Sequence, residues 1–150
     1  MLSVGKLIQM FVDVVSKNGN LLLDIGPKAD GSIPDLQLTR LREFGRWMQI
    51  NSEGIHDTRP WTRSEGKTID GTPIRFTCKN DALYAILLDA PKSREITIES
   101  LRPKEGSQVQ MLGAGGSLRW IPSGEDVRIA LPSSLPGEYA YTLKISPQPS

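Results

Sequence analysis

The chain has 150 residues, of which 38% are hydrophobic and 23% charged, and its net charge is +1. This length and composition allow one ordinary domain or two small units with a buried core. The small net charge argues against electrostatic capture of nucleic acid or acidic membranes. No apolar run approaches the length of a membrane span. Lys6 and Asp13 interrupt the apolar stretch in residues 1–15, so no signal peptide is expected there.

The sequence contains one cysteine, Cys78, and one histidine, His56. One of each cannot form an intramolecular disulfide or a structural zinc site, so neither a metal nor a cofactor is expected. Cys78 ends the alternating run 74–78, which favours a half-buried strand thiol over a catalytic one. The glycine-rich residues 113–116 lack the following Lys-Ser/Thr of a phosphate loop, and they predict a hairpin loop instead.

The chain begins with a helical pattern of apolar residues, which predicts a helix over residues 5–17. Asn18-Gly19 is expected to end this helix because both residues tolerate the left-handed conformation. The apolar face would consist of Leu7, Phe11, Val14 and Val15. Asp13 and Lys17 are spaced for a surface ion pair.

Residues 20–25 predict a short strand, and residues 34–50 a second helix. Consecutive leucines in the strand are expected when both of its faces are covered. Ser32 or Asp35 could cap the second helix, with Pro34 in its first turn. The apolar face of that helix contains Leu38, Leu41, Phe44, Trp47 and Met48.

After residue 61 the hydrophobic period becomes two, and Gly, Pro, Asn and Asp mark frequent turns. This rhythm predicts a β-sandwich. The strands are expected at 73–79, 82–89, 95–100, 108–112, 118–121, 126–131 and 139–145. The fold class is therefore α+β: a helix–strand–helix segment over residues 1–61, followed by an antiparallel β-sandwich over residues 62–150.

Several short motifs in the first segment together form a specific signature. They are SKNGNLLL at 16–23, Ile-Gly-Pro at 25–27, Asp-Gly at 30–31 and Arg-Pro-Trp at 59–61. The sequence resembles the C-terminal part of the α-L-fucosidases of glycoside hydrolase family 29. The resemblance implies a (β/α)₈-like catalytic barrel, of which 5–17 would be a late helix, 20–25 the last strand and 34–50 the closing helix. The sandwich would pack behind the barrel.

The resemblance also implies a function, the hydrolysis of terminal glycosidic bonds with retention. Retaining enzymes use two carboxyl groups about 5 Å apart. In the family both lie on earlier barrel strands, and no position in this chain matches them. The residues that select fucose are also largely upstream, so other glycosides such as β-glucosides could be accepted. The alternative is a non-catalytic carbohydrate-binding or structural module of a larger glycosidase. Family members are often secreted, periplasmic or lysosomal.

Four acidic residues are candidate catalytic groups if this chain hydrolyses glycosides without the family's usual pair. Asp24 ends the predicted strand, and that end of a barrel strand faces the active site. The family usually has Asn there, so a hydrogen bond to the backbone of the following loop is the favoured interpretation. Asp30, Asp35 and Glu53 are possible catalytic partners for Asp24, although a turn, a cap and a helix flank explain them structurally.

His56 and Trp61 are the candidate substrate-binding residues. A surface histidine is the structural alternative for His56. Trp61 could stack on a sugar, or it could anchor the interface between the two segments. Tyr84, Tyr139 and Tyr141 could line a carbohydrate-binding face of the sandwich. Without a barrel, the edges of the 20–25 strand and the helix faces that should cover the barrel would be bare, which predicts a homo-oligomer. A carbohydrate is the expected small-molecule partner.

Overall fold

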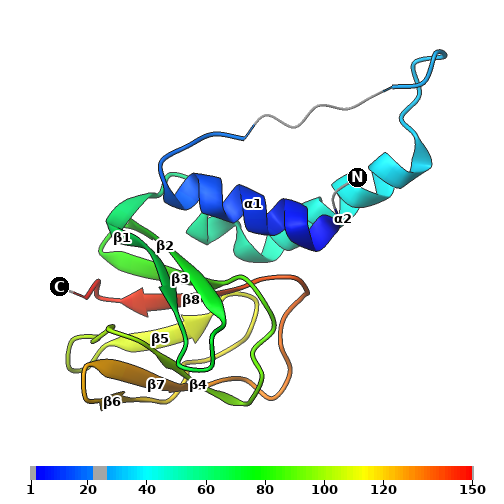
Figure 1. The fold of residues 1–150 in the computed structure, drawn as a ribbon. Coiled ribbons are helices and arrows are strands. Elements are labelled where there is room, and N and C mark those ends of the chain that lie inside the picture. The colour runs from blue at the N-terminus through cyan, green and yellow to red at the C-terminus, as the bar shows by residue number, and fades with distance from the viewer. Residues whose placement is uncertain (1–2, 22–26, 150) are drawn as a thin grey trace.

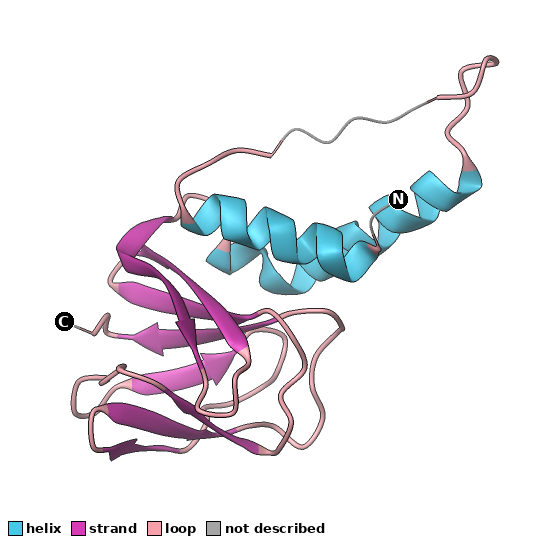
Figure 2. Ribbon diagram, viewed as in Figure 1, coloured by secondary structure: helices cyan, strands magenta, loops and turns pink. Residues whose placement is uncertain are grey.

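The computed structural model describes residues 3–21 and 27–149 in three layers. Helices α1 (Val4–Ser16) and α2 (Asp35–Asn51) lie on one face of a five-stranded antiparallel sheet (Figures 1 and 2). A three-stranded antiparallel sheet covers its other face. A 3₁₀ turn, η1 (Ser52–Gly54), links α2 to the first strand. The α+β class with a β-sandwich is confirmed.

The larger sheet has the strand order β1-β2-β3-β8-β5, and the smaller one the order β4-β7-β6. The strands are β1 (Arg59–Lys67), β2 (Pro73–Lys79), β3 (Ala82–Leu87), β4 (Glu95–Ile98), β5 (Gln108–Met111), β6 (Trp120–Ser123), β7 (Asp126–Ala130) and β8 (Tyr141–Ser146). Each of the seven predicted strands has a counterpart. The additional strand, β1, spans the expected boundary at residues 61–62 and pairs with β2, with a register irregularity between Pro60 and Glu65.

Strand β3 belongs to two hydrophobic cores because its side chains alternate between the faces of the sheet. Leu83, Ala85 and Leu87 point into the sandwich core between the two sheets. Ile86, with Leu88 just beyond the strand, joins a second core beneath the helices. All of β3 is buried. The continuous apolar run of this strand therefore has the same cause as in a parallel sheet, namely cover on both faces.

The second core, here called the helix–sheet core, fixes the helices on the larger sheet. From α1 it contains Val4, Ile8 and Val12, and from α2 Trp47, which is 3% exposed. The Trp47 Nε1–H donates to the carbonyl oxygen of Ala140 at 3.0 Å. The sandwich thus covers one side of each helix.

The predicted apolar face of α1 is only partly correct. Leu7 is buried, whereas Phe11, Val14 and Val15 are half-buried, and Phe11 and Val15 pack against the helix–sheet core. Phe11 also packs edge-on against Phe44 of α2, with ring centroids 5.1 Å apart. The two helices therefore contact each other directly.

The ends of the helices follow from local hydrogen bonds. Ser3 caps α1, because its Oγ accepts from the Lys6 N–H at 3.2 Å. Asn18 takes the expected left-handed conformation at φ 64°. The capping predictions for α2 are wrong: Pro34 occupies the cap position without a side-chain bond, and Asp35 is already the first helical residue. Residues 22–26, which hold most of the predicted 20–25 strand, lie outside the described residues.

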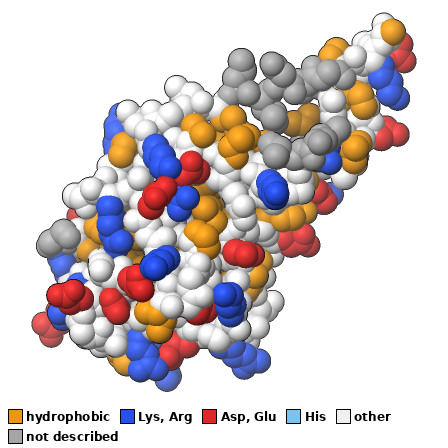
Figure 3. All heavy atoms as spheres, viewed as in Figure 1, with side chains coloured by type: hydrophobic (Ala, Val, Ile, Leu, Met, Phe, Trp, Pro, Cys, Tyr) orange, Lys and Arg blue, Asp and Glu red, His pale blue; other side chains and the backbone are white. Residues whose placement is uncertain are grey.

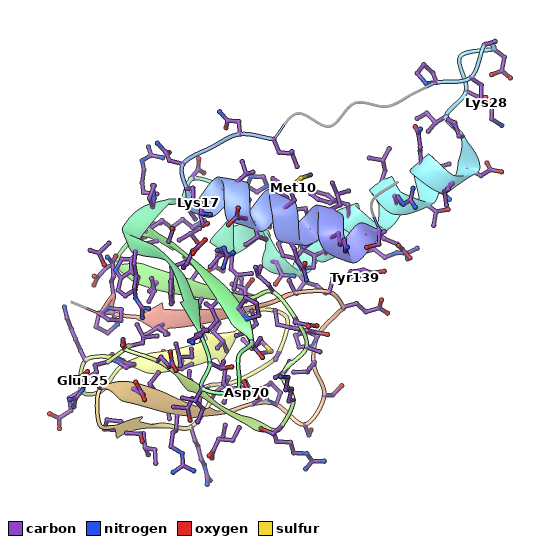
Figure 4. All side chains as sticks on the ribbon, viewed as in Figure 1. Met10, Lys17, Lys28, Asp70, Glu125 and Tyr139 are labelled. Atoms are coloured by element: carbon purple, nitrogen blue, oxygen red, sulfur yellow. The ribbon has the colours of Figure 1, made fainter. Side chains whose placement is uncertain are left out.

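A network of four charged side chains ties α1 to the sandwich. Asp13 forms the predicted pair with Lys17 at 2.9 Å, and it also accepts from Arg75 of β2 at 2.7 Å. Glu65 of β1 contacts Lys17 at 2.9 Å and Arg75 at 3.5 Å. Figure 4 places Lys17 at the end of α1, above this edge of the sheet.

Surface charge is evenly mixed. Acidic and basic side chains intersperse over the visible face of the sandwich, and neither sign dominates an area (Figure 3). This distribution agrees with the net charge of +1. In the described part of the chain, no helix is long and apolar enough to cross a bilayer.

Candidate functional site

The Asp30 carboxylate serves its local turn, and Asp35 lies exposed at the start of α2. Asp24 lies outside the described residues. Asp30 is exposed, and its Oδ1 accepts from the Ser32 N–H at 2.9 Å and from the Ser32 hydroxyl at 2.6 Å. These bonds hold the pKa of Asp30 below its usual range. Asp35 is exposed at the start of α2, where its backbone carbonyl accepts from the Thr39 hydroxyl at 2.9 Å.

Glu53 has the most specific surroundings of the described candidates. It lies on η1, which packs directly on the sheet because the Thr77 hydroxyl donates to the carbonyl of Gly54 at 2.7 Å. Its Oε2 accepts from the Lys144 Nζ and from the Tyr84 hydroxyl, both at 2.7 Å. The hydrogen bond from Lys144 is the main cause that lowers the pKa of Glu53. A carboxylate held ionised in this way is poorly suited to act as a general acid.

The described candidate acids are not brought together. Asp35 begins α2 and Glu53 follows its end, and a helix of 17 residues spans about 26 Å. Asp30 lies before Asp35 in the loop that Figure 4 shows far from the sandwich, with Lys28 near its tip. Carboxyl pairs of glycosidases lie about 5 Å apart in retaining enzymes and about 6.5–9.5 Å apart in inverting ones. Within one copy of the chain, Glu53 is therefore too far from Asp35 to form such a pair.

His56 and Trp61 lie in different surroundings. His56 is exposed after η1, and its backbone carbonyl accepts from the Lys79 Nζ at 2.8 Å. Trp61 packs against the sandwich core, with its ring centroid 5.1 Å from that of Phe76. Arg63 lies 5.6 Å above the indole, within cation–π range. The Trp61 indole thus packs on the sandwich core, whereas Trp47 belongs to the helix–sheet core.

The tyrosines do not form an exposed row. Tyr84 is 2% exposed and Tyr141 7%. Burial is the main cause that raises the pKa of both phenols. Tyr139 is half-buried on the loop before β8. The expected carbohydrate-binding face made of these three residues is therefore absent.

Cys78 is the half-buried strand thiol that the sequence predicts. Burial raises its pKa, which disfavours the reactive thiolate. Within residues 3–21 and 27–149, no group of three or more His, Cys, Asp or Glu side chains could hold a metal ion.

Sequence reasoning did not single out the residues around a cavity between α2 and the loop before β8. Glu43, Trp47 and Tyr139 are among those that line it. The sequence indicated Trp47 only as part of the apolar face of a helix, and Tyr139 only as part of a possible carbohydrate-binding face of the sandwich. The one signal available in the sequence was the turn at Pro136-Gly137, which brings the loop back toward the helix.

The comparisons with known proteins cover nearly the whole chain. Residues 1–53 match the family described as alpha-L-fucosidase, and residues 68–146 match the alpha-L-fucosidase C-terminal domain. An α-L-fucosidase of Branchiostoma floridae is 35% identical over 149 residues, which are 96% of this chain and 33% of that protein. The tissue α-L-fucosidase of Mus musculus is 36% identical over 147 residues, covering 95% of this chain and 32% of that protein. The chain thus spans about a third of the length of these relatives.

Solved structures give the same result in three dimensions. The Thermotoga maritima α-fucosidase in complex with a mechanism-based inhibitor is 39% identical to this chain, with a TM-score of 0.87. That match covers 97% of this chain and 34% of the other. The α-L-fucosidase isoenzyme 1 from Paenibacillus thiaminolyticus is 28% identical, with a TM-score of 0.79, and the match covers 99% of this chain and 35% of that chain. Because the C-terminal-domain match alone covers more than half of the 150 residues, this chain belongs to the α-L-fucosidase family, glycoside hydrolase family 29, and corresponds to its C-terminal part.

Proposed function

We propose that this chain is a structural part of an α-L-fucosidase-like retaining glycosidase, which hydrolyses terminal glycosidic bonds. The two catalytic carboxyl groups would come from outside residues 1–150. One observation carries the proposal: Glu53, the candidate with the most defined environment, is committed to Lys144 and Tyr84. It also lies about 26 Å along α2 from the next described candidate, Asp35.

The layered packing supports a structural role for this chain. The helix–sheet core holds both helices on the sandwich through Ile8 and Trp47. The helices also keep exposed apolar residues, among them Met10 and Leu36. In this proposal residues 1–61 form the end of the barrel, residues 62–150 form the sandwich, and the sandwich fixes the helices that the barrel packs against. Asp24 would hydrogen-bond the backbone of its loop, as Asn does.

An assay of the purified chain with aryl α-L-fucosides and aryl β-glucosides tests the proposal. We expect no turnover above the buffer blank, because the described acids form no catalytic pair. The variants Asp24→Asn and Glu53→Gln would be assayed beside Glu105→Gln, an exposed turn residue, as a matched control. Turnover by the parent chain that is lost in Asp24→Asn or Glu53→Gln, but kept in the control, would overturn the proposal. Turnover that no substitution changes would indicate a contaminating glycosidase.

The alternative with catalysis in this chain makes a different prediction. A site improvised between subunits would lack the family's fucose-selecting residues, and it would accept β-glucosides as well as α-L-fucosides. A site of this kind needs two carboxyl groups from different copies of the chain. Its turnover would therefore fall on dilution as the oligomer dissociates, which distinguishes it from a contaminant.

A homo-oligomer of the isolated chain is part of the same proposal. Met10 on α1 is 38% exposed and Leu36 on α2 is 56% exposed. A second copy would cover this apolar surface in the absence of a barrel. Size-exclusion chromatography with light scattering measures the mass directly. A monomer at every accessible concentration would contradict the expected association.

A further inference from the structure

A cavity of about 230 Å³ separates the second half of α2 from the loop that enters β8. Its lining consists of Glu43, Arg46, Trp47, Ile50, Gly137, Glu138 and Tyr139. The volume corresponds to roughly seven or eight water molecules, below the range of about 300–1,000 Å³ typical of drug-sized pockets. The cavity is therefore suited to one small molecule or one residue of a larger chain. None of its residues belongs to the catalytic candidates.

The walls of the cavity are held in place by contacts on both sides. Tyr139 has φ 76°, an uncommon backbone conformation for a bulky residue. Its ring packs beside α1, where a Cβ on Gly5 would lie 3.4 Å from the Tyr139 Cδ1 (Figure 4). Gly137 has φ 72°, and a Cβ there would lie 2.9 Å from the Ile50 Cδ1. The loop thus fits closely against both helices, which keeps the cavity preformed.

The polar side chains of the lining offer both acceptors and donors. The Tyr139 hydroxyl donates to the Glu43 Oε2 at 3.3 Å and lies close enough to Glu138 to interact with it. Each carboxylate has several lone-pair sites, so most acceptor positions stay free. Within the described residues, neither Glu43 nor Glu138 forms an ion pair. Arg46, with up to five N–H donors, forms no ion pair in that part of the chain either.

The floor of the cavity is apolar and rigid. Trp47 is 3% exposed, and its hydrogen bond to Ala140 fixes the plane of the indole. Ile50 continues the apolar surface one turn along α2. A pyranose ring has a matching distribution of groups, because its C–H faces are apolar and its hydroxyl groups both donate and accept.

Charge distinguishes this ligand class from the alternatives. A simple cation would use the two carboxylates but leave the N–H donors of Arg46 without an acceptor, while an anion would be repelled by both carboxylates. A neutral polyol satisfies all three groups at once. We propose that this cavity binds a neutral pyranose residue, whose hydroxyl groups donate to Glu43 and Glu138 and accept from Arg46. The inference does not depend on where the catalytic acids lie, because it concerns binding by the described residues alone.

Two-dimensional ¹H–¹⁵N NMR on the full chain tests the proposal, with L-fucose, D-glucose and D-galactose as probes. Butylammonium and acetate serve as cationic and anionic comparisons. We expect saturable shifts of the amides at 43–50 and 137–140 with at least one of the sugars. The variants Glu43→Gln and Glu138→Gln should each weaken the binding of that sugar roughly two- to tenfold, because an amide oxygen accepts a hydrogen bond more weakly than a carboxylate. Glu105→Gln, on an exposed turn away from the cavity, should bind like the parent chain.

Every outcome of this experiment is decisive. No saturable shift with any sugar would overturn the proposal, as would sugar binding that both glutamate variants leave unchanged. Tighter binding of butylammonium than of every sugar would replace the pyranose with a cation. Thermal unfolding of each variant, followed by circular dichroism, verifies that it is folded. The turnover assays are independent of these results, so sugar binding at the cavity and catalysis can fail separately.

Discussion

The substitution Ile8→Ala would measure how strongly the sandwich holds the helical layer. Ile8 is 0% exposed and belongs to the helix–sheet core with Ile86 and Trp47. Removing the three side-chain carbons beyond Cβ forfeits about 0.8 kcal/mol of transfer free energy for each. The cavity that remains adds a further cost, and buried Ile→Ala substitutions cost about 2–5 kcal/mol in total. We expect a loss of about 3–4 kcal/mol from the free energy of unfolding.

Met10→Ala is the matched control on the same helix. Met10 is 38% exposed and faces away from the sheet, so its loss should cost less than about 1 kcal/mol. Urea unfolding would be followed by tryptophan fluorescence and by far-ultraviolet circular dichroism, at two protein concentrations. Both probes should give one transition with an unchanged m-value. Equal losses in the two variants, or helices that unfold before the sandwich in the parent chain, would refute the packing of α1 on the sheet.

Two further predictions concern the sandwich and its links to the helices. The hydrogen bond from Lys144 lowers the pKa of Glu53 from 4.5. The ionised carboxylate therefore stabilises the folded state above pH 4.5, and this contribution is lost as the pH falls through the lowered pKa. Urea titrations across this range should show a smaller loss for Glu53→Gln than for the parent chain, and parallel curves would contradict the ion pair. A Cβ at Gly66 would lie 2.6 Å from a ring carbon of the buried Phe76, so Gly66→Ala should cost about 1–3 kcal/mol. Gly45→Ala, on α2 with no atom within 4 Å of the new Cβ, should instead stabilise the folded state by about 0.5–1 kcal/mol. Equal shifts of the thermal unfolding temperature in the two variants would contradict the close contact at Phe76.

Local pattern was sufficient for most of the secondary structure. The period-two rhythm located seven strands to within a few residues, because alternating burial and turn residues are properties of neighbouring positions. It missed β1, since Arg59–Lys67 has no alternation of apolar and polar residues, and its pairing with β2 supplies the order that the pattern lacks. The capping assignment for α2 failed for a related reason: the Ser32 hydroxyl is used by Asp30 in a tighter local turn.

The candidate site shows the same division between what is local and what is not. The short motifs at 16–34 and 59–61 were enough to indicate the family, because a motif is defined by the order of residues along the chain. Which acids converge depends on distances in space, so the commitment of Glu53 to Lys144, 91 positions away in the sequence, required coordinates. The same holds for the cavity between α2 and the loop before β8, for which the sequence indicated only the turn at Pro136-Gly137.

The sequence by itself determined the element types, the sandwich class and the ancestry of the chain, because each is written in spacing, composition and short motifs. Only the tertiary structure decided which faces are covered. Ala82–Leu87 is apolar throughout, and the sequence could not say that one face meets a second sheet and the other meets two helices. Burial is a property of what approaches from far along the chain, and periodicity reports only that a face is buried, never by what.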